Sequence, residues 1–503
     1  MSGSWIVESV DETRLARLAD LIALKVHVGD LITLTGDLGA GKTTFARAFI
    51  RAMLDAPQAE VPSPTFTLVQ PYATPRLDVA HFDLYRLTSG DELDEIGFDE
   101  AIAGGLALVE WPERAEGRLH GSHLDITLSA GTSPETRTVT ITPDARWTAR
   151  IDRLRDIDTF IADRAGRLRY LQGDASTRAY ARLTAPNSSF VLMDSPRQPD
   201  GPPIRNGLPY SQIAHLAEDV TAFHAIADAL ASCGMTVPTI RAFDHERGLL
   251  LIDDLGDLTY GLALAQGLDQ RTLWTAAVDR LVALRAHPPP EGLPVPGSAA
   301  EHTLHRFDRT ALMIEVELTT DWYWPAVKGS AIPADVKAHF VRIWNALIDW
   351  IETLPLGWVL RDYHSPNLMW LGHGRVGVLD FQDAMRGPWA YDVVSLLQDA
   401  RLDVPEDIER DLLAHYRQEV ARREPSFDAA AFDTAYAVLG AQRNTKLLGI
   451  FRRLAHRDGK TAYLAHIPRI WRYLERDLAH PALADLAAWF GRHFPPAGRE
   501  RNS

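Results

Sequence analysis

A glycine-rich loop near the start of the chain constrains its fold more than any other feature. Residues 36–43 read GDLGAGKT and fit the pattern G-x-x-x-x-G-K-[ST]. The apolar run DLITLT (30–35) leads into this loop, and TTFARAFIRAM (43–53) leads out of it with helical character. In such a turn, backbone N–H groups surround phosphate oxygens, and the N-terminus of the following helix favours the anion. The order strand, loop, helix therefore predicts an α/β domain that binds a nucleotide.

Each residue type in this loop has a predicted task. The glycines let the backbone approach the phosphates, Lys42 reaches the terminal phosphates, and the Thr43 hydroxyl can bind Mg²⁺. The predicted ATP-binding residues of the loop are Gly36, Gly39, Gly41, Lys42, Thr43 and Thr44.

Two acids downstream are candidates for holding Mg²⁺ and orienting water, which nucleotide hydrolysis requires. Asp83 lies in HFDLYRL (81–87) and Glu110 in LALVEWPE (106–113), each at the end of an apolar, strand-like run. A single acid is more often a surface group. The position of both acids after such runs, downstream of a phosphate loop, favours a functional role.

A second phosphate-handling motif of a different kind lies far along the chain. LRDYHSPNLMW (360–370) places Asp362 and Asn367 at the D-x-x-x-x-N spacing of a kinase catalytic loop. Asp380 follows at the end of another apolar run, VGVLD, and Asp392 begins a helical stretch that can hold the loop. The combination predicts Asp362 as the base that accepts or orients the proton of the attacking hydroxyl, and Asn367 and Asp380 as metal ligands.

Length and patterning predict more than one domain. A chain of 503 residues is longer than a single hydrophobic core usually supports. We expect an α/β P-loop NTPase domain (1–150) followed by an α+β, protein-kinase-like bilobal domain. Strand-rich residues 151–257 would form its small lobe and helix-rich residues 258–503 its large lobe.

Composition limits the classes of binding partner and the cell compartment that the sequence predicts for this protein. The net charge of −15 disfavours strong direct binding of nucleic acid, and the single cysteine allows no intramolecular disulfide. The first residues predict no secretory signal, and no apolar run reaches the ~18 residues that cross a bilayer. These features predict a cytoplasmic protein without a membrane anchor.

The first 150 residues resemble the TsaE family of small ATPases. The resemblance rests on five blocks in order: GDLGAGKTT, SPTFTLVQPY, HFDLYRL, ELDEIGFDE and LVEWPE. It implies a role in threonylcarbamoyl modification of adenosine 37 of tRNA, with TsaB and TsaD proteins as partners. It further implies that Lys42 and Thr43 bind ATP-Mg²⁺ and that Glu110 promotes hydrolysis. By the same resemblance, Thr65 and Asp83 help hold the metal, and Trp111 packs by the nucleotide or a partner.

Residues of about 155–490 resemble the aminoglycoside phosphotransferase (choline kinase-like) superfamily, and within it the AmgK sugar kinases. LQGDASTRAYARL, LLIDDLGD, LRDYHSPNLMWL, LDFQDA and QRNTKLLGIFRRL carry this resemblance. It implies ATP-dependent phosphorylation of the C1 hydroxyl of N-acetylmuramate and N-acetylglucosamine in cell-wall recycling. Asp362 would be the base, Asn367 and Asp380 the metal ligands, and 173–180 a nucleotide-covering turn.

Two departures from that pattern leave alternatives open. Leu360 stands where the family often has a histidine that braces the loop. Met193 and Asp194 stand near the expected place of a phosphate-binding lysine, so Arg178 is the predicted substitute. The alternatives are a degenerate kinase fold that acts as a binding module, and an aminoglycoside or choline-like acceptor.

Two further stretches have competing interpretations. The basic segment 442–460 is interpreted as a solvated helix face, with a site for a muramate carboxylate or a sugar phosphate as the alternative. The aromatic triplet WYW (322–324) either stacks on a sugar ring or packs between helices.

Overall fold

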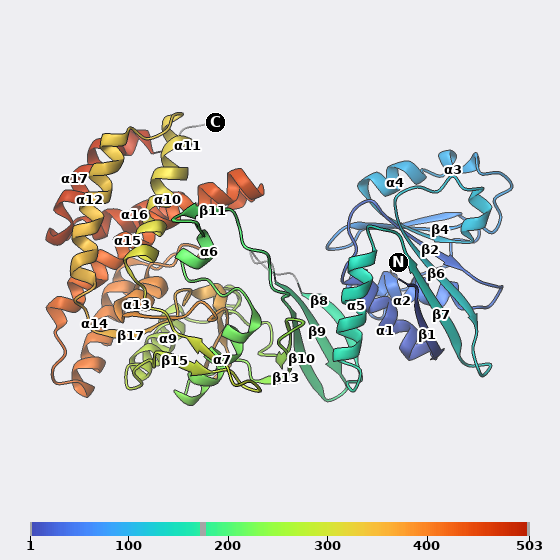
Figure 1. Cartoon of the computed structure of the whole chain (residues 1–503), viewed down its shortest axis with the longest axis horizontal. Coiled ribbons are helices and arrows are strands. Elements are labelled where there is room, and N and C mark those ends of the chain that lie inside the picture. The colour runs from blue at the N-terminus through green and yellow to red at the C-terminus, as the bar shows by residue number, and fades with distance from the viewer. Residues whose placement is uncertain (1–2, 172–177, 500–503) are drawn as a thin grey trace. The chain divides into compact units, whose positions relative to one another are not determined.

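The computed structural model describes residues 3–171 and 178–499 (Figure 1). The chain divides into two compact units. The first unit consists of Met1–Pro196 and Arg241–Asp254, and the second of Arg197–Ile240 and Leu255–Ser503.

A seven-stranded sheet with the order β1-β7-β6-β2-β5-β4-β3 organises the first 143 residues. Its central strands, β6-β2-β5-β4, are parallel, and β1, β7 and β3 pair antiparallel at the two sides. The strands are β1 (Trp5–Val10), β2 (Asp30–Thr35), β3 (Val69–Tyr72), β4 (Asp78–Asp83), β5 (Gly105–Glu110), β6 (Ser122–Ala130) and β7 (Arg137–Pro143).

Burial on both faces explains why the central strands are apolar throughout. Every residue of β5 is buried, as are the first five of β2, which is the pattern of parallel strands covered by helices on both sides. Apolar residues of α1 (Glu12–Ala23) and α2 (Lys42–Leu54) belong to one core cluster with Ile32 and Leu34. A second cluster contains α3 (Glu92–Glu95) and α4 (Phe98–Gly104) residues with Leu31 and Val109.

The first unit contains a second sheet, with five strands in the order β13-β14-β10-β9-β8. Helix α5 (Thr148–Phe160) connects the two sheets along the chain. The strands are β8 (Arg167–Leu171), β9 (Ala179–Ala185), β10 (Ser188–Asp194), β13 (Ile240–Asp244) and β14 (Leu249–Asp253).

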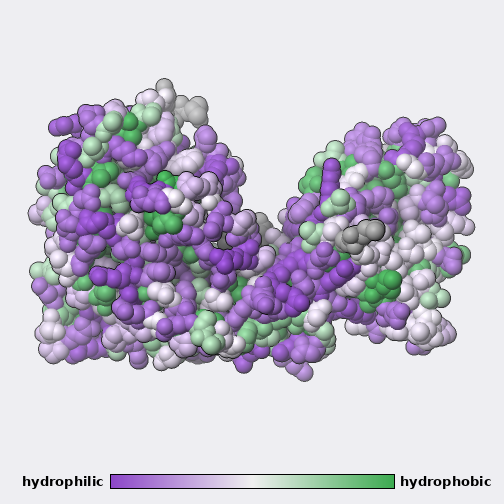
Figure 2. Space-filling view, in the orientation of Figure 1, coloured by the Kyte–Doolittle hydropathy of each residue, from purple (hydrophilic) through white to green (hydrophobic). Residues whose placement is uncertain are grey.

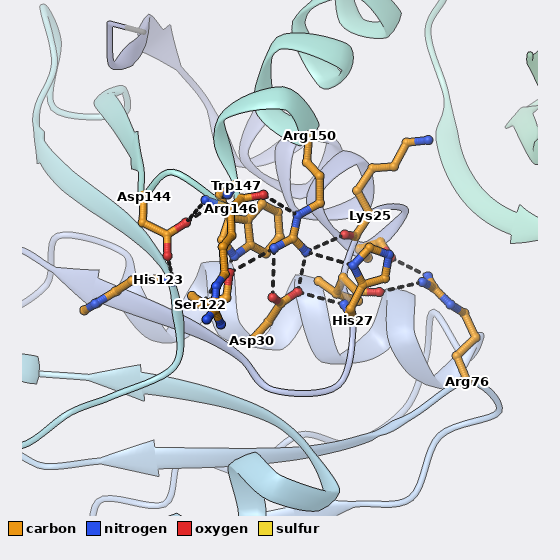
Figure 3. Close-up of polar contacts among 12 residues, drawn as sticks. Lys25, His27, Asp30, Arg76, Ser122, His123, Asp144, Arg146, Trp147 and Arg150 are labelled. Carbon is orange, nitrogen blue, oxygen red and sulfur yellow. Dashed lines mark hydrogen bonds and ion pairs between the residues drawn. The ribbon is translucent and has the colours of Figure 1, made fainter. Parts of the chain in front are cut away.

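The two sheets of the first unit share one hydrophobic core. Leu168, Leu192 and Leu251 of the second sheet belong to the same buried cluster as Leu18 and Phe45 from the helices of the first. Helix α5 is fastened to the first sheet by an arginine at its start, as Figure 3 shows. The Arg150 guanidinium donates to the Asp30 carboxylate at 2.6 and 2.9 Å and to the Lys25 carbonyl at 3.0 Å.

Ion pairs reinforce this junction. The buried Asp20 on α1 accepts bonds from Arg167 at 2.6 and 2.7 Å and from the Leu168 N–H at 3.0 Å. At the end of β10, Asp194 accepts from Arg153 at 2.6 Å and lies 2.5 Å from Lys25 Nζ. Charged groups from residues far apart in the sequence thus bind β8 and β10 to the first sheet.

The second unit is mainly helical. The 30-residue α15 lies against α10, α13 and α16. Its main helices are α7 (Val220–Ser232), α9 (Gln270–Leu284), α10 (Arg309–Leu318), α12 (Ala334–Ile351), α13 (Ala390–Leu397), α14 (Glu406–Arg423), α15 (Ala429–Asp458), α16 (Ile467–Leu478) and α17 (Ala484–His493). The shorter helices are α6 (Tyr210–Ile213), α8 (Tyr260–Ala265) and α11 (Trp324–Lys328).

Short strands interrupt these helices near the predicted catalytic loop. β17 (Leu356–Val359) pairs antiparallel with β20 (Met385–Pro388), and β18 (Leu368–Trp370) with β19 (Val376–Val378). Two further antiparallel pairs lie outside this region. They are β11 (Pro203–Arg205) with β12 (Leu208–Pro209), and β15 (Gly292–Pro294) with β16 (Glu301–Thr303).

The face of the molecule drawn in Figure 2 is mostly hydrophilic. On the face drawn in Figure 2, hydrophobic residues are scattered and form no continuous band. In the described part of the chain, none of the helices combines the length and apolar character that a bilayer crossing needs.

Candidate functional site

The glycine-rich loop joins β2 to α2 and depends on left-handed backbone conformations. Gly36, Gly39 and Gly41 have φ values of 147°, 77° and 106°, a region that residues with a Cβ rarely adopt. A Cβ at Gly36 would lie 2.3 Å from the Leu128 carbonyl oxygen. The loop can therefore form only with glycine at this position.

Lys42 lies over its own loop. Its Nζ donates to the carbonyl oxygens of Gly36 at 2.6 Å and Asp37 at 2.9 Å, and it lies 3.5 Å from the centre of the Trp111 ring. Burial lowers the pKa of Lys42, although nearby carboxylates, Glu110 first among them, oppose this shift. The structure thus brings together the predicted residues Lys42 and Trp111.

A chain of hydrogen bonds links the loop to the sheet through Glu110. The Thr43 hydroxyl donates to Glu110 Oε2 at 2.9 Å, and Glu110 Oε1 lies 3.0 Å from His81 Nε2. Both Glu110 and His81 are buried. We did not predict His81 from the sequence. It stands two residues before Asp83 on β4, and alternate residues of a strand share a face, which is the signal that could have found it.

Asp83 occupies the same edge of the sheet. It pairs in register with Glu110 because the carboxyl ends of the parallel strands β4 and β5 meet there. The Thr65 hydroxyl donates to Asp83 Oδ2 at 2.6 Å, and the Ser63 hydroxyl lies 2.8 Å from that of Thr65. Two carboxylates and two hydroxyls therefore line one site. This donor set fits Mg²⁺, which prefers oxygen ligands from one or two carboxylates together with phosphates and water.

The predicted kinase loop in the second unit also gathers its residues. Asn367 Nδ2 donates to the Asp362 carbonyl at 3.0 Å and lies 3.5 Å from Asp380 Oδ2. Gln382 Nε2 donates to Asp380 Oδ1 at 2.9 Å. The side chains of Asn367 and Asp380 supply oxygen atoms that fit Mg²⁺ as well. In the described ranges, no group of three or more His, Cys, Asp or Glu side chains is arranged to hold a metal ion.

Asp392 holds the start of this loop, as its position in the sequence predicted. Its carboxylate accepts the backbone N–H groups of Leu360 at 2.6 Å and Arg361 at 2.9 Å. Burial raises the pKa of Asp392 to about 7. Leu360 is itself buried, so apolar packing and Asp392 together hold the start of the loop.

Asp362 is poised as a carboxylate. Burial favours its neutral form, but electrostatic interactions with His364, Lys446, Arg361 and Arg443 hold its pKa below the usual value. Its side chain keeps 38% exposure and can therefore reach a ligand. An ionised, accessible carboxylate is the state that a general base requires.

The small-lobe predictions have a mixed outcome. Residues 172–177 of the predicted nucleotide-covering turn lie outside the described part of the chain, and the role of Arg178 stays a prediction. Asp194 stands near the expected position of the lysine and is held by Lys25 and Arg153. Arg182 pairs at 2.7 Å with Asp254 at the end of β14.

Two interpretations of surface segments can be settled. The solvated-face interpretation of 442–460 is wrong for its first part, since residues 442–446 on α15 are buried. Helix α15 is enclosed by other helices, so charge alone did not indicate exposure. For the aromatic triplet, packing is the outcome at Tyr323 and Trp324, which are buried against Trp471 and Trp489.

The fold and both sites define a class: an ATP-using enzyme that joins a P-loop domain to a kinase-like phosphotransferase. The family described as Threonylcarbamoyl adenosine biosynthesis protein TsaE matches residues 9–139, and the Phosphotransferase enzyme family matches residues 167–427. The chain therefore belongs to the phosphotransferase enzyme family and carries a TsaE-family domain ahead of the kinase fold. The predicted fold class is confirmed.

Individual relatives match the two parts separately. An N-acetylmuramate/N-acetylglucosamine kinase of Caulobacter vibrioides is 39% identical over 338 residues, covering 65% of this chain and 91% of that protein. A kinase of the same name from Pseudomonas aeruginosa is 36% identical over 318 residues, covering 62% and 84%. A tRNA threonylcarbamoyladenosine biosynthesis protein TsaE of Rickettsia conorii is 40% identical over 124 residues, covering 25% and 69%.

Proposed function

We propose that this chain is a bifunctional cytoplasmic enzyme with the domain limits predicted above. Its P-loop domain hydrolyses ATP in support of threonylcarbamoyl modification of tRNA adenosine 37. Its kinase domain transfers a phosphoryl group from ATP to the C1 hydroxyl of N-acetylmuramate or N-acetylglucosamine. The main support is the convergence of Asp362, Asn367 and Asp380 in a chain similar to kinases named for these sugars.

In the kinase reaction, Asp362 accepts or orients the proton of the sugar hydroxyl that attacks the terminal phosphate. Asp392 keeps Asp362 in place through the backbone of the two preceding residues. Asn367 and Asp380 would hold Mg²⁺, which neutralises charge on the phosphates when bound. Gln382 fixes the orientation of Asp380 through its 2.9 Å bond.

In the ATPase reaction, Lys42 and the loop N–H groups bind the phosphates, and Glu110 positions the attacking water. His81 and Thr43 hold the two Glu110 oxygens from opposite sides. Thr43, Thr65 and Asp83 would contribute to the Mg²⁺ site. We propose TsaB- and TsaD-type proteins as partners, because a chain of net charge −15 needs other proteins to hold tRNA.

The charge around Asp362 bears on the alternative acceptors. Arg361, Arg443 and Lys446 all act on this carboxylate. A choline-like amine or a polycationic aminoglycoside needs acids and aromatic faces around its cation. Arg361 and Lys446 are paired with Glu315, and Arg443 is the further cation near Asp362 that supports a neutral or acidic sugar instead.

The kinase half is tested with the full chain, ATP, Mg²⁺ and each sugar, with sugar 1-phosphate measured directly. We expect turnover with wild type and a loss of at least about 100-fold in kcat for Asp362→Asn, the range for removal of a general base. Lys42→Ala is the matched control and should retain sugar phosphorylation. Turnover of an aminoglycoside or choline, with both amino sugars inert, would refute this half of the proposal.

The ATPase half is tested by ATP hydrolysis and by tRNA modification with TsaB- and TsaD-type proteins. In this test Lys42→Ala is the inactivating variant and Asp362→Asn is the control. Lys42→Ala should abolish hydrolysis, and Asp362→Asn should retain it. Equal tRNA modification with wild type and Lys42→Ala would contradict the proposal.

A further inference from the structure

The middle of α15 contains a run of buried polar residues that is unusual for a helix. Residues 442–446, QRNTK, have exposures of 0 to 8%. Gln442 and Lys446 donate to the Glu315 carboxylate at 3.0 and 2.8 Å, and Asn444 donates to Gln398 and Asp477 at 2.7 and 3.1 Å. Buried polar groups are stable when they have such partners.

Gln442 Oε1, Asn444 Oδ1 and Thr445 Oγ1 of this run lack a hydrogen-bond partner among the described residues, and Arg443 is the charged residue that shares this property. It is 3% exposed, and its Nη1 has no hydrogen-bond partner among residues 3–171 and 178–499. An arginine cannot escape burial by losing its proton. A buried cation without a hydrogen-bonded partner destabilises the fold. An anionic ligand that binds the guanidinium would supply the missing partner.

The position of Arg443 in the fold indicates which ligand it could bind. Glu315 binds Gln442 and Lys446, which stand on either side of Arg443 in the helix, and it also binds Arg361 of the catalytic loop. The charge of Arg443 accordingly acts on Asp362. Lys446, one helical turn further on, lies 3.5 Å from the Tyr391 hydroxyl in the same region. Arg443 therefore belongs to the part of α15 that borders the catalytic loop.

The carboxylates nearby already have other partners. Glu315 binds Arg361, Lys446 and Gln442. Asp392 accepts two backbone N–H groups, and Asp399 accepts the Ser365 N–H at 2.8 Å. Asp362 has to stay available for the substrate hydroxyl. Among residues 3–171 and 178–499, none of these carboxylates forms a hydrogen bond or an ion pair with the Arg443 guanidinium.

We propose that Arg443 binds an anionic substituent of the sugar acceptor, namely the lactyl carboxylate of N-acetylmuramate. This inference rests on the proposed kinase function. The lactyl ether is attached at C3, two ring bonds from the C1 hydroxyl that faces Asp362, so a base and a cation close together suit this sugar. A planar guanidinium binds a carboxylate through two parallel hydrogen bonds, which a lysine cannot do.

N-acetylglucosamine has a hydroxyl in place of the lactyl ether and leaves Arg443 without a counter-charge. It remains a substrate through its C1 hydroxyl, but it gains less binding energy. Arg443 is therefore a specificity-determining residue that favours the acidic sugar over the neutral one.

The test compares kcat/KM for N-acetylmuramate and N-acetylglucosamine in the full chain. Arg443→Gln should lower the ratio of the two values by about 30-fold, the order expected for a charge-assisted pair in a buried site. Arg443→Lys should restore part of the ratio. Arg457→Gln is the matched control on the same helix, since Arg457 is 58% exposed and paired with Asp458, and it should leave the ratio unchanged.

Thermal unfolding provides a second readout. Because Arg443→Gln removes an uncompensated buried charge, its Tm without ligand should be higher than that of wild type. N-acetylmuramate should raise the Tm of wild type more than that of the variant.

The outcomes separate this inference from the proposed function. If wild type phosphorylates both sugars and Arg443→Gln lowers both kcat/KM values equally, Arg443 is structural and the inference is overturned. A lower Tm for the ligand-free variant also overturns it. If wild type phosphorylates neither sugar, the result contradicts the proposed kinase function, on which the inference about Arg443 rests.

Discussion

Replacing Asp194 with alanine tests how tightly the second sheet of the first unit is bound to the first. The Asp194 side chain is 5% exposed and forms ion pairs with Lys25 and Arg153. Lys25 follows the end of α1, and Arg153 lies within the connecting helix α5. The substitution removes the carboxylate and leaves two cations facing each other without an anion. Repulsion between them adds to the lost attraction.

The expected loss follows from burial. Removing one partner of a buried ion pair costs about 3–5 kcal/mol. Lys25 and Arg153 keep 22% and 15% side-chain exposure, so water recovers part of their solvation. We therefore expect Asp194→Ala to lower the unfolding free energy of the first unit by about 2–3 kcal/mol.

Urea denaturation of the full chain measures this loss. With a slope of about 2–3 kcal/mol/M, the midpoint should fall by about 1 M. Asp253→Ala is the control in the same sheet, because its partner Arg241 is 49% exposed and such pairs contribute less than about 1 kcal/mol. A double-mutant cycle with Lys25→Met should give a coupling of at least about 1 kcal/mol. Equal midpoints for Asp194→Ala and Asp253→Ala would refute the reasoning.

Three further predictions concern the sites. Gly36→Ala should abolish binding of a fluorescent ATP analogue to the P-loop, because its Cβ would lie 2.3 Å from a backbone oxygen; unchanged affinity would contradict this. His81→Leu should lower the ATPase rate by about 10-fold while sparing nucleotide affinity, since it frees Glu110 without touching the phosphate loop; a loss of affinity instead would show that His81 supports the loop. Asp392→Asn should lower the sugar-kinase kcat by about 10- to 100-fold, because an amide cannot accept both N–H groups. The pKa of Asp392 is raised from 3.8 to about 7, so folded protein binds the proton more tightly than unfolded protein does. The unfolding free energy of wild type should therefore fall relative to Asp392→Asn as the pH rises from about 4 to about 7; parallel pH profiles would contradict the assignment.

Local chemistry made much of both sites predictable. The phosphate loop, the acids at the strand ends and the catalytic loop each depend on residues close together in the sequence. Parallel strands then bring Asp83 and Glu110 to one edge without further information. The assignment of Asp392 as the brace of the catalytic loop rested on the same local logic.

What the sequence did not reveal depends on packing between distant residues. Asp194 was noticed only where a lysine was expected, yet its partners lie up to 169 positions away. Arg443 was interpreted as part of a solvated face because charged residues are seldom fully buried. Helix α15 is buried because it packs against α10, α13 and α16. No local sequence pattern predicts this burial.

The shared core of the first unit has a consequence for synthesis on the ribosome. Residues of β14 complete a core that includes α1 and α2. The roughly 200 residues between the end of α2 and the end of β14 take about 10 to 40 seconds to translate at about 5–20 residues per second. During that interval the apolar residues of α1 and α2 in the nascent chain stay partly exposed to solvent. Chaperones can therefore bind the nascent chain before either domain is completely synthesised. Translational pauses in this window should therefore reduce the yield of both activities together.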